Sequence, residues 1–255
     1  MQMKIKDMKW VAPTNTNRER LLREWEARFC EIERSTRHWQ KGRSAESLAD
    51  FFVNHHGEDC VKKAVNKILE QDPIVALKMA EIECKCPFDD CRNTRRQDMG
   101  IVGQTKGGKN VFIGIEAKVD ETFGPTVGKA YQEAQEYKRQ HPQSRRVERI
   151  VDLCKRFGVK PDDKEISGLR YQLFHFTAGT ASVPMNKHGW IATCGDIGVH
   201  VMMTLVFKTA KYSADKGSKN KADYDRFVGR FFKDGRLKDM DLPSRPYAIY
   251  CEIPL

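Results

Sequence analysis

Apolar residues at every second position mark a β-strand near the middle of the chain. These positions are Val111, Ile113, Ile115, Ala117 and Val119. Side chains of a strand alternate between the two faces of its sheet, so one face of this segment is expected to pack on a core. The residues between them, two of which are charged, belong to the other face.

A second apolar pair lies upstream and predicts the partner strand of a β-hairpin. Met99 and Ile101 precede a Lys-Gly-Gly-Lys turn at residues 106–109. Directly opposed residues of an antiparallel pair point to the same face of the sheet. Placing Met99 and Ile101 beside the apolar face therefore puts Asp98 on the face of Glu116.

The length of the turn decides whether these side chains converge. A symmetric two-residue turn at 107–108 would pair Asp98 with Ala117, on the core face. An odd-numbered connection or a one-residue bulge would instead set Asp98 across from Glu116 or Lys118. The core pattern favours the second arrangement, which brings two carboxylates and an amine together.

The remaining periodicity predicts alternating helices and strands. Helical spacing of apolar residues indicates helices over 18–34, 44–55, 58–71, 129–140, 145–157, 166–177 and 224–232. Apolar runs indicate strands at 74–84, 199–208 and 247–253, with an arm or edge strand at 1–13. The polar, Lys-rich segment 212–222 is expected to be a mobile loop.

Two facing carboxylates beside a lysine are costly unless a cation neutralises them. Mg²⁺ favours oxygen ligands and often binds through one or two carboxylates plus a substrate phosphate. Such an ion polarises a phosphoryl oxygen and acidifies a bound water, which a neighbouring lysine can orient or deprotonate. The residue types therefore point to phosphodiester hydrolysis with Mg²⁺ or Mn²⁺, in which Asp98 and Glu116 bind the metal and Lys118 assists the water.

The pattern of Asp98 followed by Glu116-Ala117-Lys118 resembles that of the PD-(D/E)XK nuclease superfamily, which includes restriction endonucleases. This chain departs from the pattern by carrying Gln97 where the superfamily frequently has proline. The resemblance implies an α/β fold, a restriction-endonuclease-like α/β/α sandwich with a central mixed sheet and a catalytic β-hairpin. It also implies a nuclease in a restriction, repair or defence context. The length suits a single nuclease-like domain, 1–255, with 1–40 as an N-terminal helical embellishment.

The resemblance suggests further site residues. Superfamily members often carry an acidic metal ligand on a helix before the hairpin, and Glu46 is the candidate here, although a solvated helix charge fits it equally well. Other members position the phosphate or water with polar side chains, many of them on a helix after the hairpin. The corresponding candidates are Gln97, Arg170, Gln172 and His175. Three arginines before the hairpin suit phosphate contacts, with a solvated basic loop as the alternative: Arg92, Arg95 and Arg96.

Charge and hydropathy restrict the partners. A net charge of +10 and a pI near 9.2 suit a polyanion, and the resemblance favours nucleic acid, DNA more than RNA. The longest apolar run, 199–207, is too short to cross a bilayer, so no membrane span is expected. Residues 1–9 are charged throughout, which argues against a signal peptide and for a cytoplasmic protein. The sequence leaves a homodimer open.

Three closely spaced cysteines raise zinc as a second metal. Structural zinc sites pair cysteines two to four residues apart and use four ligands, whereas Cys84 and Cys86 are separated by one residue. Reduced structural cysteines are therefore favoured for Cys84, Cys86 and Cys91. Two alternatives to a nuclease stay open: a nucleic-acid-binding protein on the same fold that does not cleave, and a zinc-stabilised interaction module.

Overall fold

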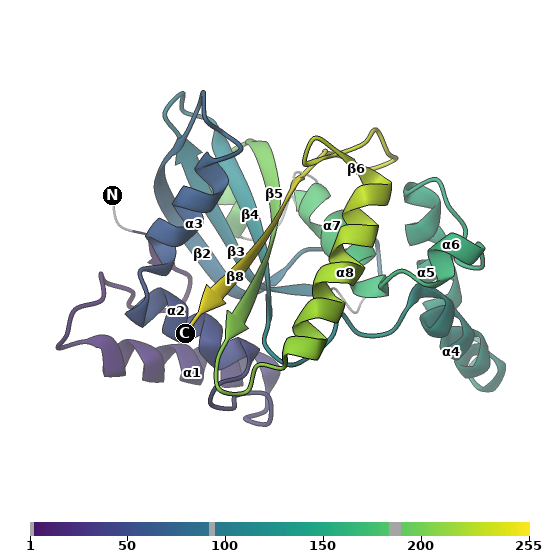
Figure 1. Ribbon diagram of the computed structural model, residues 1–255, viewed down its shortest axis with the longest axis horizontal. Helices are drawn as coiled ribbons and strands as arrows, with labels where there is room; N and C mark the ends of the chain where they lie inside the picture. The colour runs from purple at the N-terminus through teal and green to yellow at the C-terminus, as the bar shows by residue number, and fades with distance from the viewer. Residues whose placement is uncertain (1–2, 92–94, 184–189) are drawn as a thin grey trace.

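A mixed β-sheet forms the centre of the molecule (Figure 1). In residues 3–91, 95–183 and 190–255, which the computed structural model describes, eight strands lie in the order β1-β2-β3-β4-β5-β8-β7-β6. β2, β3 and β4 run antiparallel in succession, while β4, β5 and β8 run parallel. The strands are β1 (Lys4–Ile5), β2 (Ile74–Lys85), β3 (Arg96–Thr105), β4 (Asn110–Lys118), β5 (Ile197–Lys208), β6 (Phe232–Lys233), β7 (Arg236–Leu237) and β8 (Tyr247–Pro254).

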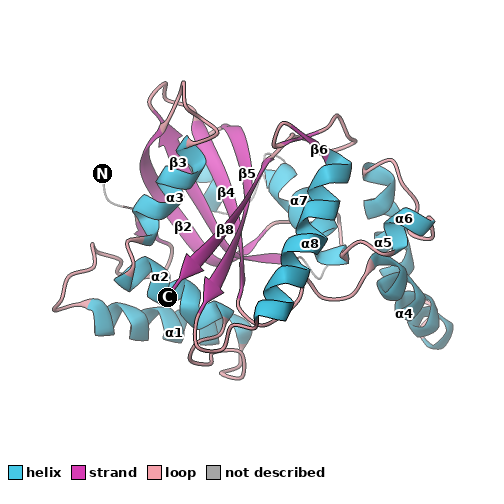
Figure 2. Cartoon of the chain, in the orientation of Figure 1, coloured by secondary structure: helices cyan, strands magenta, loops and turns pink. Residues whose placement is uncertain are grey.

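Helices cover both faces of this sheet, in agreement with the expected α/β sandwich (Figure 2). The first three pack on one face and share a hydrophobic core with it, and α7 and α8 pack with a second core on the other face. The helices are α1 (Arg18–Glu33), α2 (Ser44–Asn54), α3 (Gly57–Asn66), α4 (Val127–Gln140), α5 (Arg146–Arg156), α6 (Lys164–Ser167), α7 (Tyr171–Ala181) and α8 (Ala214–Phe231), with a 3₁₀ turn η2 (Trp190–Cys194). No helix of the described residues is long and apolar enough to cross a membrane.

The first core confirms the alternation seen in the sequence. All five apolar positions of the segment 111–119 are buried in it, together with Met99 and Ile101 from β3. The N-terminal segment 1–40 contributes Leu21, Trp25 and Phe29 to the same core. That segment is therefore packed against the sheet beside β2.

One expected loop is a helix. The segment 212–222 was predicted to be mobile, but α8 begins at Ala214, capped by the Ser213 hydroxyl, which accepts from the Lys216 amide at 3.4 Å. The first turns of α8 bury Gly217, Asn220 and Asp223. Because small and polar residues occupy the inward face there, no apolar period is visible in the sequence, and the loop prediction was wrong.

Candidate active site

The hairpin of β3 and β4 has the register that the core pattern required. Met99 lies opposite Ile115 and Ile101 opposite Ile113. The Thr105 amide donates to the Lys109 carbonyl at 2.9 Å, which leaves a three-residue connection, 106–108, with Gly108 in the left-handed region at φ +85°. An odd-numbered connection was predicted, and the structure confirms it.

The two strands separate at the level of Asp98. The paired register ends at Met99 and Ile115, so one further step would set Asp98 opposite Glu116. There the Asp98 carboxylate takes the place of a backbone partner and accepts a hydrogen bond from the Ala117 amide at 2.6 Å. The donor thus belongs to Ala117, the residue between Glu116 and Lys118.

Glu116 and Lys118 form a buried ion pair on β4. Lys118 Nζ lies 2.7 Å from Glu116 Oε1, and the side chains of Lys118 and Glu116 are only 6% and 5% exposed. Gln172, in the first turn of α7, donates from Nε2 to the same Glu116 oxygen at 2.5 Å. Of the polar candidates expected after the hairpin, Gln172 is therefore one that reaches the carboxylates. We call Asp98, Glu116 and Lys118 the carboxylate–lysine site.

Electrostatics separate the roles of these groups. Burial, followed by the charge of Glu116, raises the pKa of Asp98 to about 8. Burial alone would lower the pKa of Lys118, but the charges of Glu116 and Asp98 outweigh it and raise that pKa above its ordinary value. Lys118 therefore stays protonated at neutral pH, whereas the Asp98 carboxyl holds a proton that a cation would displace.

A third carboxylate, Glu83 on β2, was not anticipated from the sequence. Ile82 pairs with Met99 and Cys84 with Gln97, so Glu83 lies at the level of Asp98 on the neighbouring strand. Burial and then the charge of Asp98 raise the pKa of Glu83 to about 9. Its backbone is left-handed, with φ 50°, which is rare for a residue with a side chain.

This level of the sheet is irregular on both strands. On β2, Ile82 belongs to the first core but Cys84 packs on the opposite face, beside Gly100. On β3, Met99 belongs to the first core but Gln97 bonds to α7. Residues two apart on a regular strand share a face. The alternation of side chains between the two faces of the sheet is therefore broken at Glu83. The sequence contains no signal that would have placed Glu83 beside Asp98.

Two of the expected phosphate-positioning residues are engaged elsewhere. Gln97 donates from Nε2 to Thr180 Oγ1 at 2.9 Å and to the Phe176 carbonyl at 3.3 Å, both on α7. Arg170 Nε donates to Asp223 Oδ2 at 2.5 Å. These side chains tie α7 to β3 and to α8, and their donors already have protein acceptors.

Glu46 has a partner in the turn before its own helix. Its Oε2 accepts from the Gly42 amide at 2.8 Å, an interaction that stabilises the turn before α2. His175 packs edge-on against Tyr171, with ring centroids 5.5 Å apart. Burial lowers the pKa of His175 well below its ordinary value, and the nearby charges of Arg95, Arg149 and Lys118 act in the same direction, so the ring is neutral.

The two arginines before the hairpin that the structure describes, Arg95 and Arg96, contact different helices. Arg96 pairs with Glu33 at the end of α1, with 2.5 Å between NH1 and Oε1. Arg95 is exposed and lies over the Tyr171 ring at 5.9 Å. Arg92 lies outside the described residues.

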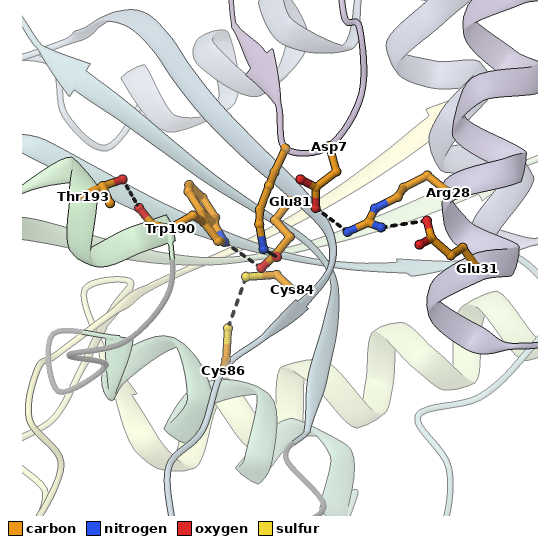
Figure 3. A network of polar contacts seen from close by, with 9 residues as sticks. Asp7, Arg28, Glu31, Glu81, Cys84, Cys86, Trp190 and Thr193 are labelled. Atoms are coloured by element: carbon orange, nitrogen blue, oxygen red, sulfur yellow. Dashed lines mark hydrogen bonds and ion pairs between the residues drawn. The ribbon is translucent and has the colours of Figure 1, made fainter.

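The cysteines expected to be reduced are free thiols in the described structure. Cys86 Sγ donates to Cys84 Sγ at 3.8 Å, and both side chains are buried (Figure 3). This bond, together with burial, raises the pKa of Cys84 well above its ordinary value, so the metal-free thiol is protonated. Across the described residues, no three histidine, cysteine or acidic side chains already converge as a metal-binding group.

A family model matches residues 20–249, and its description is "Domain of unknown function (DUF6946)". The chain belongs to the DUF6946 family. Neither the curated proteins nor the solved structures include a match to it. The matched range contains β2, β3, β4 and α7 entire, so the carboxylate–lysine site lies within the DUF6946 domain.

The donor set of this DUF6946 chain fits a hard divalent cation. Asp98, Glu116 and Glu83 offer only oxygen atoms, the ligand type that Mg²⁺ and Mn²⁺ prefer. Burial and the neighbouring carboxylates raise the pKa values of Asp98 and Glu83 despite the charges of Lys118 and Arg96, so a bound cation would favour their ionised forms. Two carboxylates suffice for a Mg²⁺ site when substrate oxygen and water complete the coordination.

Proposed function

We propose that this chain is a Mg²⁺- or Mn²⁺-dependent nuclease with a restriction-endonuclease-like fold, acting on DNA in preference to RNA. One observation carries the proposal: the buried Lys118–Glu116 pair at 2.7 Å, with the Asp98 carboxylate bound to the amide of the residue between them. The order of these residues on two adjacent antiparallel strands matches the PD-(D/E)XK pattern. We infer the nuclease activity from the arrangement of this site and not from the match to the DUF6946 family model.

The residues of the site have separate tasks in this proposal. Asp98 and Glu116 would hold the cation, and Gln172 keeps Glu116 in place through its 2.5 Å hydrogen bond. When bound, Mg²⁺ or Mn²⁺ supplies Lewis-acid polarisation of the phosphoryl oxygen and acidifies the attacking water. Lys118, held protonated, orients that water and stabilises the negative charge that develops on the phosphoryl oxygens.

The reaction is a hydrolysis. The water oxygen forms a bond to phosphorus, the bond from phosphorus to one ester oxygen breaks, and the proton lost by the water balances the one gained by the leaving alcohol. The products are a phosphate monoester and a free hydroxyl. No oxidant, reductant or further co-substrate is needed, and the two carboxylates, Lys118 and the cation suffice for this chemistry.

The test is incubation of the full chain with linear and circular DNA and RNA in the presence of Mg²⁺ or Mn²⁺. We expect Glu116→Gln and Lys118→Met each to lower cleavage by about 10²–10³-fold, as for the loss of one group that stabilises transition-state charge. Lys6→Met is the matched control, because Lys6 also pairs with a glutamate, Glu81, at 2.6 Å but lies outside the site.

The outcomes discriminate between functions. Cleavage that survives both Glu116→Gln and Lys118→Met contradicts the assignment. Cation-dependent binding of nucleic acid without cleavage by the wild-type chain would favour the non-cleaving binding protein. Stoichiometric zinc in purified protein, lost on substitution of Cys84 or Cys86, would instead favour the zinc-stabilised module.

A further inference from the structure

A cavity of about 550 Å³ lies beside the carboxylate–lysine site. We call it the α1–α2 cavity, because the end of α1, the connection at residues 34–43 and the start of α2 supply much of its lining. Acidic residues line one part of the cavity, and basic residues of the α1–α2 connection line another. The acidic residues are Glu33, Glu83, Asp98 and Glu121, and the basic residues are Arg37, His38 and Arg43.

The acidic side is only partly paired within the protein. Glu33 pairs with Arg96 at 2.5 Å, whereas Glu83, Asp98 and Glu121 form no ion pair with a lysine or arginine of the described residues. Asp98 accepts from the Ala117 amide, and Glu121 accepts from the backbone of its own turn, at 3.0 Å from the Asp120 amide. The Glu83 carboxylate forms no hydrogen bond within the described part of the chain. The cavity therefore presents three acidic side chains that form no ion pair with a basic side chain of the described residues.

The basic side chains of the cavity are accessible to a ligand. Arg37 and His38 are exposed and make no ion pair with any described residue. Arg43 contacts Asp120 at 3.3 Å, but its side chain is 44% exposed, so the contact is a surface pair of small energy. A phosphate could replace Asp120 as the partner of Arg43 at little cost.

The acidic and basic side chains that line this cavity do not pair with one another, which favours a ligand that carries both signs. A free divalent cation would satisfy only the carboxylates, and a free anion only the arginines. A phosphodiester with its bound cation satisfies both, through carboxylate oxygens on the cation and guanidinium donors on the phosphate. A second cavity, lined by Asp89 and Arg149 among others, differs in this respect. There the carboxylate and the guanidinium pair with each other at 2.6 Å.

We propose that the α1–α2 cavity binds the phosphate backbone of the substrate together with its cation, with Glu83 as a further cation ligand and Arg37 and Arg43 as phosphate contacts. This inference rests on the proposed nuclease function and specifies where the substrate enters. The strand of nucleic acid then runs along the α1–α2 connection and not along Arg95, which lies over Tyr171 on the α7 side.

The first experiment measures binding of a labelled DNA oligonucleotide by the full chain carrying Lys118→Met, with Ca²⁺, over a range of salt concentrations. Adding Arg37→Ala or Arg43→Ala is expected to weaken binding about tenfold and to reduce the slope of log K against log salt by about 0.9 for each phosphate that the variant no longer neutralises. Arg236→Ala on β7 is the control, because it removes the same charge at the opposite end of the sheet.

The second experiment tests Glu83 through the cation. We expect Glu83→Gln to lower the Ca²⁺-induced gain in DNA affinity about tenfold, while Glu81→Gln, two residues away, leaves it unchanged. Glu83→Gly separates a ligand from a structural residue. Glycine adopts the left-handed backbone conformation of Glu83 without the steric cost that a side chain brings, so this variant should unfold at no lower temperature than the parent while losing the cation effect.

The results distinguish this inference from the nuclease proposal. Unchanged binding in Arg37→Ala, Arg43→Ala and Glu83→Gln, with a loss in Arg95→Ala, overturns the cavity assignment and leaves the nuclease function standing. A clear fall in the melting temperature of Glu83→Gly makes Glu83 structural and removes it as a ligand. If the wild-type chain neither binds nor cleaves DNA or RNA with any divalent cation, both proposals are wrong.

Discussion

Two glutamates on β2, Glu81 and Glu83, lie two residues apart and have opposite surroundings. Glu81 accepts from Lys6 Nζ and from Trp190 Nε1, each at 2.6 Å (Figure 3). Glu83 has no such partner in the described structure and faces the charge of Asp98. Glu81 is thus paired with a lysine of the same chain. The Glu83 carboxylate has no ion-pair partner among the described residues.

The same contrast separates two polar residues at the start of α7. Arg170 donates to Asp223, which also binds Arg226 at 2.6 Å, so this network is closed within the protein. Gln172 reaches Glu116, where the acidic charge exceeds the basic charge. Buried charges that are paired stabilise the fold, and buried like charges that are not paired indicate a functional site. Substitutions at the two kinds of cluster should therefore have opposite effects.

The largest difference is expected between Asp98 and Glu81. Asp98→Asn should lower cleavage by about 10²–10³-fold and should not reduce stability, because it removes a carboxylate repelled by its neighbours. Glu81→Gln should cost about 1–2 kcal/mol of unfolding free energy, since it weakens a charge-assisted pair, and should leave cleavage per folded molecule unchanged. Urea denaturation and initial cleavage rates measure the two effects. Equal loss of stability in both variants would remove the distinction between the clusters.

The next effect concerns the closed network on α7 and α8. Asp223 is 5% exposed at its side chain and pairs with two arginines. Asp223→Asn leaves Arg170 without its charge partner and should cost about 3 kcal/mol of stability. Cleavage by the fraction that remains folded should be retained. If Asp223→Asn keeps full stability but loses cleavage, Arg170 takes part in the reaction and the prediction is wrong.

A smaller effect is a change of stability with pH. The pKa values of Asp98 and Glu83 rise from 3.8 and 4.5 to about 8 and 9 on folding. Between these limits the folded state binds more protons than the unfolded state, so the free energy of unfolding should fall as pH rises from about 4 to about 9. A divalent cation should offset the loss at the alkaline end. The charges that act on the two carboxyls, besides each other, come from Glu33, Arg96, Glu116, Lys118 and Glu121.

Denaturation at several pH values with a chelator measures this dependence. The Asp98→Asn and Glu83→Gln double variant isolates it, because buried His200, whose pKa is lowered to about 4, adds an opposite slope below pH 6.5 in both proteins. The difference between wild type and double variant should therefore appear above pH 4 and grow towards pH 9. A constant difference would show that the two carboxyls titrate normally.

The smallest effect is expected at Glu46. Glu46→Gln weakens the bond to the Gly42 amide and should lower stability by less than about 1 kcal/mol. Cleavage and its dependence on Mg²⁺ concentration should remain those of the wild type. A large rise in the Mg²⁺ requirement would return Glu46 to the metal site that the superfamily resemblance suggested.

The sequence determined the parts of this protein that depend on local periodicity. Alternation in β4 and the pair Met99 and Ile101 set the hairpin register, because an odd shift would have paired these apolar residues with the face of Glu116 and Lys118. That register brought Asp98 to Glu116 and Lys118. The sequence likewise indicated β5 through its long apolar run, and β2 and β8 through their apolar residues. The polar inward face of α8 gave no such pattern, and there the prediction was wrong.

Only the tertiary structure decided which charged side chains are neutralised. Arg170 pairs with Asp223, which lies 53 residues further along the chain, and Glu81 pairs with Lys6. The charges of Arg170 and Glu81 are therefore neutralised within the protein. Glu83 comes to the level of Asp98 at the place where β2 and β3 change face, which no periodic pattern encodes. Backbone alternation is a local property that neighbouring residues fix. The partner of a charge depends on what distant segments bring within about 4 Å, and folding alone determines that.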